Sequence, residues 1–204
     1  AELVQHWGLT APALAGHDIG GGIVLRAHLV HGVPAGRLAL LDAAVLGPWN
    51  TPFTEHQQRY AEAYRTMPHH IFDDLITARL RTAVHRPMSE EIIAAYRAPW
   101  AGPAGQQRWI DQVCAVSSED TRRAVDRLDR ITAPTLVLWG AEDTWLPTNT
   151  GDRLTSAIPH AENTTIPHAG HFLPEDQPQR TANALVEFLA RSHTPAQPPP
   201  VTAT

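Results

Sequence analysis

Residues 16–21, with the sequence GHDIGG, constrain the fold of this chain more than any other segment. The preceding residues 13–15 are small and apolar, which is typical of a short buried strand, and residues 22–30 have helical apolar spacing that ends at Gly32. A sharp turn between a strand and a helix has little room for Cβ atoms and therefore favours glycine. Such a turn presents its central residue as a nucleophile, and here that residue is Asp18.

Two later segments supply the partners that a nucleophile needs. Residues 135–139 (TLVLW) predict a strand, and Asp143 follows shortly after its end. Residues 163–166 predict another strand, and His171 lies in the loop beyond it. The order of nucleophile, acid and histidine along the chain is typical of α/β-hydrolases, and each of the three residues follows a predicted strand.

Two of these assignments have competing interpretations. Asp18 could instead cap the helix that follows it, because aspartate is a common N-cap residue. Glu142 and Asp42 are alternative acids, since Glu142 precedes Asp143 and Asp42 also ends a predicted strand, over residues 38–42. The spacing from the neighbouring glycine and proline favours Asp143.

Composition and charge limit the partners. At 204 residues with 43% hydrophobic content, the chain can bury one sizeable core and a small lid. A net charge of −5 without a basic patch argues against nucleic acid, and no apolar run approaches the ~20 residues that span a membrane. Cys114 is the single cysteine, which excludes an internal disulfide and favours a cytoplasmic location. We expect a small-molecule substrate.

A metal site is a further alternative, because His168 and His171 have H-x-x-H spacing. Zinc needs additional ligands in suitable positions, and the sequence around His171 fits a catalytic histidine loop better. We therefore expect no metal and no cofactor.

The segments form a predicted α/β architecture. Residues 1–47 hold the turn and the following strand, and residues 48–130 are helical without any strand-like run, as expected of a helical cap. Residues 131–192 hold the acid, the histidine and a last helix, and the Pro-rich residues 193–204 predict a disordered tail. This predicts a parallel sheet of about four strands, with helices on both faces and a cap insertion.

The chain resembles the α/β-hydrolase superfamily, specifically its aspartate-nucleophile members, the haloalkane dehalogenases and epoxide hydrolases. Residues 16–21 are similar to their nucleophile motif, residues 139–143 to their acid-bearing strand end, and residues 170–178 to their histidine loop. Residues 96–100 (YRAPW) resemble a cap segment of the dehalogenases, and the resemblance extends to about Arg191. The catalytic residues that it implies are Asp18, Asp143 and His171.

An aspartate nucleophile restricts the reaction. Attack by a carboxylate on an ester would give a mixed anhydride, whereas attack on a saturated carbon that carries a leaving group gives an ordinary alkyl ester. That step suits a small apolar halide or an epoxide. His171 would then activate water to hydrolyse the ester, while Asp143 holds the imidazole tautomer.

Aromatic residues are the candidates for holding the leaving group. In the related enzymes the residue after the nucleophile is tryptophan, but here it is Ile19, whose side chain cannot donate a hydrogen bond. A halide site would have to use cap tryptophans, and an epoxide would need a tyrosine acid. The candidate substrate-binding residues are Ile19, Trp49, Tyr60, Tyr64, Tyr96, Trp100 and Trp109.

The resemblance also implies about four strands and an oxyanion loop before the nucleophile. Here the turn begins at residue 16, and the residues before it are too few to form them. Residues 31–34 (HGVP) mimic an oxyanion loop but follow a helix, so we interpret them as a helix stop. We therefore expect a truncated chain or half of a split protein, whose sheet a partner chain or a missing segment would complete. The alternative function is a non-catalytic half-domain with an idle triad.

Overall fold

The computed structural model describes residues 1–191, and the predicted tail at 193–204 lies outside them. The predicted α/β fold is confirmed, because this part of the chain forms a parallel sheet in the order β1-β2-β3-β4. The register places His17 opposite Leu41 and Gly140 opposite Ile166. The strands are β1 (Ala13–His17), β2 (Arg37–Leu41), β3 (Thr135–Gly140) and β4 (Ala161–Ile166).

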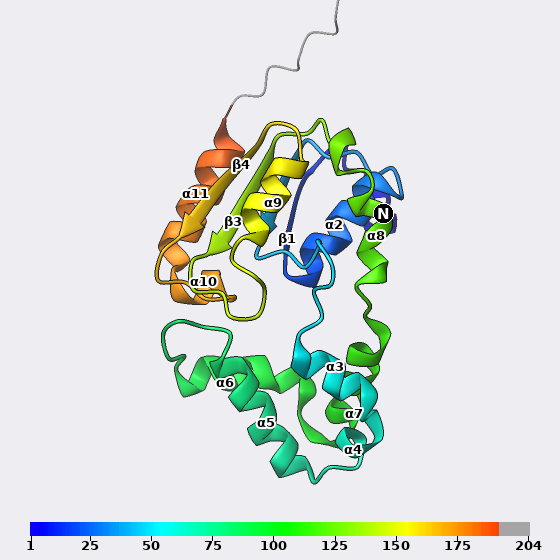
Figure 1. The fold of residues 1–204 in the computed structure, drawn as a ribbon, viewed down its shortest axis with the longest axis vertical. Coiled ribbons are helices and arrows are strands. Elements are labelled where there is room, and N and C mark those ends of the chain that lie inside the picture. The colour runs from blue at the N-terminus through cyan, green and yellow to red at the C-terminus, as the bar shows by residue number, and fades with distance from the viewer. Residues whose placement is uncertain (192–204) are drawn as a thin grey trace, which may run out of the picture.

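Helices follow or connect the strands, and the longest insertion of helices lies between β2 and β3 (Figure 1). Within residues 1–191, no helix is both long and apolar enough to cross a membrane. The α-helices are α1 (Glu2–His6), α2 (Ile19–Leu29), α3 (Pro52–Arg59), α4 (Ala61–Arg65), α5 (His69–Arg81), α6 (Glu90–Arg97), α7 (Gly102–Ala115), α8 (Glu119–Val125), α9 (Thr150–Ala157), α10 (Leu173–Asp176) and α11 (Pro178–Ala190). Short 3-10 helices are η1 (Ala98–Trp100) and η2 (Leu128–Arg130).

Helices cover both faces of the sheet, because alternate residues of a strand point to opposite sides. Val137 and Trp139 of β3 belong to a core with residues of α2, α8 and α9. Leu136 and Leu138 point the other way and pack with Phe188 of α11. Every residue of β3 is buried, which explains its continuous apolar sequence. Figure 1 shows α11 on one side of the sheet and α9 on the other.

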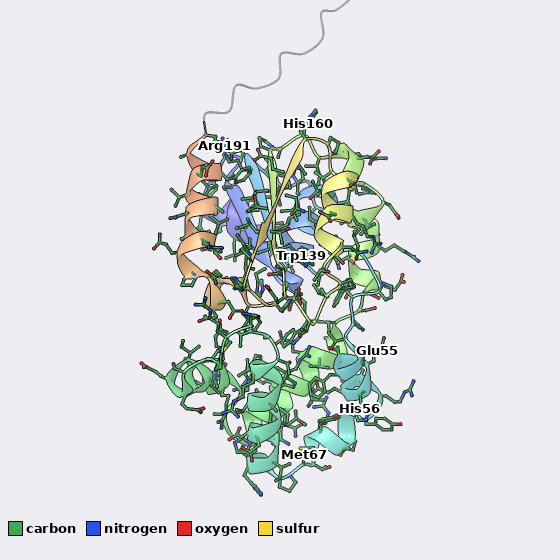
Figure 2. The ribbon with its side chains drawn as sticks, turned by 60° about the vertical axis from the view of Figure 1, so that its left-hand side comes forward. Glu55, His56, Met67, Trp139, His160 and Arg191 are labelled. Atoms are coloured by element: carbon green, nitrogen blue, oxygen red, sulfur yellow. The ribbon has the colours of Figure 1, made fainter. Side chains whose placement is uncertain are left out.

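Helices α3 to α7 form a separate layer beyond the C-terminal ends of the strands (Figure 1). This layer has its own apolar core, which includes Phe72 and Ile110. In Figure 2, Trp139 lies within the sheet layer, whereas His56 and Met67 lie in the helical layer.

One part of the predicted cap lies elsewhere. Helix α8 packs against α2, and Ala124 and Leu128 join the core cluster of the sheet. Residues 119–130 therefore belong with the sheet layer, and the helices beyond the strand ends come from the earlier part of residues 48–130. The apolar face of α8 looks the same in sequence whichever layer it contacts.

The turn after β1 depends on a glycine that no larger residue can replace. A Cβ atom at Gly16 would lie 2.2 Å from the carbonyl oxygen of Gly20, which is backbone and cannot move aside. We expect Gly16→Ala to lower the free energy of unfolding by about 1–3 kcal/mol, measured by urea denaturation. Gly20→Ala is the matched control, since its Cβ meets nothing within 4 Å and alanine favours helix. Equal urea midpoints for the two variants would contradict this packing.

Candidate active site

Asp18 occupies the sharp turn between β1 and α2. Its φ of 52° lies in the left-handed region, which is rare for a residue with a side chain and marks a strained turn. Although Asp18 stands at the N-cap position, its side chain makes no capping hydrogen bond to α2. The side chain is 34% exposed and lines a cavity. The interpretation of Asp18 as a helix cap is therefore wrong.

The structure brings the three predicted catalytic residues together at the C-terminal ends of the strands. Nε2 of His171 lies 3.6 Å from Oδ1 of Asp18, and Nδ1 of His171 lies 3.0 Å from Oδ2 of Asp143. The other oxygen of Asp143 accepts hydrogen bonds from the backbone N–H groups of Trp145 and Leu146, at 2.7 Å and 3.1 Å. These bonds fix the carboxylate, which in turn orients the buried imidazole.

The alternative residues have other partners. Oδ1 of Asp42 accepts a hydrogen bond from the N–H of Gly140 at 2.8 Å, and Oε2 of Glu142 accepts one from Ala169. Neither carboxylate is the hydrogen-bond partner of His171, so the geometry favours Asp143 over both. The ring of His168 packs against that of His85, with the ring centroids 5.6 Å apart.

The negative charge of Asp18 and the positive charge of His171 stabilise each other. Burial raises the pKa of Asp18, but contact with His171 outweighs burial and holds the pKa below its ordinary value. Burial lowers the pKa of His171, but the hydrogen bond to Asp143 and the nearby Asp18 carboxylate raise it to about 9. At neutral pH the resting site therefore holds an ionised Asp18 beside an imidazolium.

Asp42 behaves differently, because burial raises its pKa to about 8 although the Gly140 N–H partly opposes this. The folded protein then keeps the proton of Asp42 up to about pH 8, whereas the unfolded chain loses it near 3.8. Asp42 should therefore lower the unfolding free energy as the pH rises from about 4 to 8, by up to about 1.4 kcal/mol per pH unit. We expect Asp42→Asn to remove this slope, measured by urea denaturation across that range. Parallel pH profiles for wild type and variant would contradict the buried, protonated Asp42.

A cavity of about 260 Å³ lies between the strand ends and the helical layer, and both Asp18 and His171 line it. Its other walls are largely aromatic and apolar. Five of the seven predicted substrate-binding residues line this cavity: Ile19, Trp49, Tyr96, Trp100 and Trp109.

The prediction that Tyr60 and Tyr64 contact the substrate is wrong, because neither residue lines the cavity. The Tyr64 side chain is buried within the helical layer, and its hydroxyl lies 2.7 Å from Nδ1 of His56. Tyr60 is 49% exposed and packs its ring against His56 at 4.7 Å. The sequence predicted the helices here, but it did not fix which face of each helix would point to the strand ends.

Trp145 and Arg79 are two of the cavity residues that the sequence did not predict. The ring of Trp145 stacks on that of His171, with centroids 4.8 Å apart and planes 26° apart. Cζ of Arg79, from α5, lies 3.4 Å from the centroid of the Trp145 ring. The position of Trp145 two residues after Asp143 was a usable signal, but nothing local in the sequence distinguishes Arg79 from the other arginines of the cap.

Comparisons with known proteins agree with this fold. A model of the alpha/beta hydrolase family matches residues 1–184. Haloalkane dehalogenase 2 of Mycobacterium tuberculosis is 30% identical over 200 residues, which are 91% of this chain and 67% of that protein. The 2-hydroxymuconate semialdehyde hydrolase of Pseudomonas sp. (strain CF600) is 27% identical over 196 residues, or 90% of this chain and 63% of that protein.

A solved structure is also similar over most of the chain. The alpha/beta hydrolase fold protein from Burkholderia ambifaria has a TM-score of 0.88 and 30% identity, covering 91% of this chain and 69% of that one. The chain spans less than two thirds of the length of several curated relatives that it matches. The family model matches residues 1–184, and the structure contains the parallel sheet and the turn after β1. The chain therefore belongs to the alpha/beta hydrolase family.

Proposed function

We propose that this hydrolase uses Asp18 as a nucleophile to form an alkyl-enzyme ester from a small halide, and that His171 activates water to hydrolyse it. The observation that carries the proposal is the Asp18 carboxylate, which lines the cavity with Nε2 of His171 3.6 Å away. The pairing of His171 with buried Asp143 supports the role of an oriented base.

In the first step an Asp18 oxygen forms a bond to a saturated carbon, and the bond from that carbon to the halogen breaks. The halogen leaves as halide with the electron pair. The low pKa of Asp18 supports this role, because the carboxylate is ionised at neutral pH and needs no base. Serine in the same position would need His171 to remove its proton first.

In the second step His171 takes a proton from water, whose oxygen adds to the carbonyl carbon of the ester. Ester formation removes the charge of Asp18, and with it one of the causes of the high pKa of His171. The imidazole can then lose its proton more easily and act as a base. The backbone N–H of Ile19 at the start of α2 is the proposed donor to the resulting oxyanion. The alcohol then leaves with the proton from His171.

The hydrogen bonds of the aromatic residues favour a halide over an epoxide. The indole N–H of Trp49 donates to Thr121 at 3.0 Å, whereas the buried Nε1 of Trp109 has no partner within residues 1–191. Trp109 therefore has a free donor for a leaving halide. The hydroxyl of Tyr96 donates to Glu175, and burial together with this contact raises its pKa to about 12, which makes Tyr96 a poor acid for opening an epoxide.

Oxygen-18 labelling tests the ester mechanism. After repeated turnover of a bromoalkane in oxygen-18 water, a solvent oxygen should reside in the Asp18 carboxylate, which trypsin releases within residues 1–26. In a single turnover with excess protein, the alcohol should carry an unlabelled oxygen that came from Asp18. A labelled alcohol from a single turnover, with an unlabelled peptide, would show that water attacks the substrate directly.

A second candidate function is a non-catalytic half-domain, and the edge of the sheet favours it. Within residues 1–191, β1 pairs with β2 alone, so its other edge carries backbone groups that a further strand could bind. We propose that a partner chain or a further segment completes the sheet there and supplies a second oxyanion donor. Without that donor, turnover by these 204 residues should be roughly 10²–10³-fold lower. A complete lack of turnover would favour the half-domain.

A further inference from the structure

Arg79 is the one arginine or lysine among the described residues that line the cavity. It comes from α5, one turn after Leu75 and beside the buried Ile76 and Leu80, and its own side chain is half-buried. A guanidinium is always charged at neutral pH, and withdrawing it from water into an apolar wall is unfavourable unless it meets an opposite charge. At this position the guanidinium therefore requires a negatively charged partner.

The contacts that Arg79 makes within the protein do not include such a partner. Its guanidinium lies over the rings of Trp145 and Phe53, with Cζ 3.4 Å and 5.4 Å from their centroids. Nη2 donates to the hydroxyl of Thr51 at 3.2 Å. Among residues 1–191, no carboxylate lies within 4.0 Å of Arg79. The aromatic contacts hold the guanidinium in place, and the carboxylates of Asp18 and Asp143 act on its charge only from beyond 4.0 Å.

Neighbouring arginines of the same layer have conventional partners. Arg81 pairs with Glu90 at 2.9 Å, and Arg97 pairs with Asp73 at 2.9 Å. Arg79 differs from both because it faces the cavity. Burial lowers the pKa of Arg79 to about 10, so the side chain still carries its charge at neutral pH.

A second hydrogen-bond donor lines the same cavity. Gln57 is 1% exposed, and its Nε2 has no hydrogen-bond partner within the described residues. It lies on α3 one turn after Phe53, the residue whose ring contacts the Arg79 guanidinium. Both Thr51 and Phe53 touch Arg79 from the start of the same helix. Arg79 and Gln57 therefore add a positive charge and an unpaired donor to the lining of the cavity.

We propose that Arg79 binds a carboxylate group of the substrate, so that the substrate class is a short haloalkanoic acid rather than a neutral haloalkane. This inference rests on the proposed function for the reacting end of the substrate, which lies at Asp18. The carboxylate accepts hydrogen bonds from Arg79, with Gln57 as a second donor, and the halogen-bearing carbon reaches the nucleophile. Trp145 connects the two ends, since its ring contacts both Arg79 and His171.

Binding measurements with unreactive ligands test this inference separately from catalysis. Butyrate and butyramide have the same size and differ in charge, and neither has a leaving group. By isothermal titration calorimetry we expect the 204-residue chain to bind butyrate roughly tenfold or more tightly than butyramide, the ratio expected for one charge-assisted hydrogen-bonded pair. Arg79→Gln should lose this preference and keep its affinity for butyramide, and Arg79→Lys should keep part of it.

Arg81→Gln is the matched control, because Arg81 lies on the same helix but is exposed and paired with Glu90. It should retain the preference of the wild type. Three results would overturn the inference. The wild type could bind the two ligands equally or not detectably, Arg79→Gln could lose its affinity for both ligands, or Arg81→Gln could lose the preference for butyrate. Butyrate and butyramide do not react, so their binding is independent of the ester mechanism. If the protein prefers butyrate but the labelling experiment finds no oxygen-18 in Asp18, only the ester mechanism is refuted.

Discussion

Replacing Asp18 with alanine is expected to abolish turnover, because no other carboxylate occupies the turn after β1. The alkyl ester cannot form without this oxygen, and loss of a catalytic nucleophile typically costs roughly 10⁴–10⁶-fold in rate. Halide release followed over time measures the effect. Asp18→Asn should behave in the same way, although slow deamidation can regenerate aspartate, and for this reason alanine is the primary variant.

Asp74→Asn provides the control for the Asp18 variants, because Asp74 is an exposed carboxylate on α5. It should retain the wild-type rate. Circular dichroism should show that the Asp18 variants are folded, since alanine and asparagine keep the Cβ atom of aspartate and Asp18 makes no capping hydrogen bond to α2. A folded Asp18→Ala protein with the wild-type rate of halide release would exclude Asp18 as the nucleophile.

Replacing His171 with glutamine is expected to separate the two steps. Asp18 needs no base for its attack, so the variant should still release halide once, in an amount close to one per protein chain. Hydrolysis of the ester should then stop, because glutamine cannot take a proton from water. Ion chromatography of the released halide measures this single burst.

The result would differ if His171 took part in the first step. If His171 were required for the first step, as in an enzyme with a serine nucleophile, His171→Gln would release no halide at all. Cys114 is exposed and could itself react with a halide, so both proteins should carry Cys114→Ser. The Cys114→Ser protein with an intact His171 should release halide continuously instead of in a single burst.

The strands were predictable from the sequence because each combines an apolar or β-branched run with a turn at its end. Strand β3 was predicted over 135–139 and extends by one residue to Gly140. The parallel arrangement of the strands was predictable because helices join them, whereas the order β1-β2-β3-β4 was not predicted. In contrast, the assignment of α8 to the sheet layer depends on contacts with α2, and the sequence of α8 does not reveal them.

The positions of the candidate catalytic residues were predictable for a related reason. Asp18, Asp143 and His171 each follow a strand, and parallel strands bring their C-terminal ends to one edge. The walls of the cavity were less predictable, because they depend on how helices of the second layer rotate. Tyr64 turned into the interior of that layer, and Arg79 turned towards the cavity.

Mass spectrometry of the His171→Gln protein can detect the alkyl ester on Asp18 itself. After incubation with 3-bromopropionate or 1-bromopropane, in the Cys114→Ser background, trypsin releases residues 1–26, which contain Asp18 and one other carboxylate, Glu2. We expect this peptide to gain the mass of the alkyl group, and fragmentation to place that group on Asp18. Unmodified residues 1–26 in a folded protein, with either reagent, would contradict an aspartate nucleophile in this site.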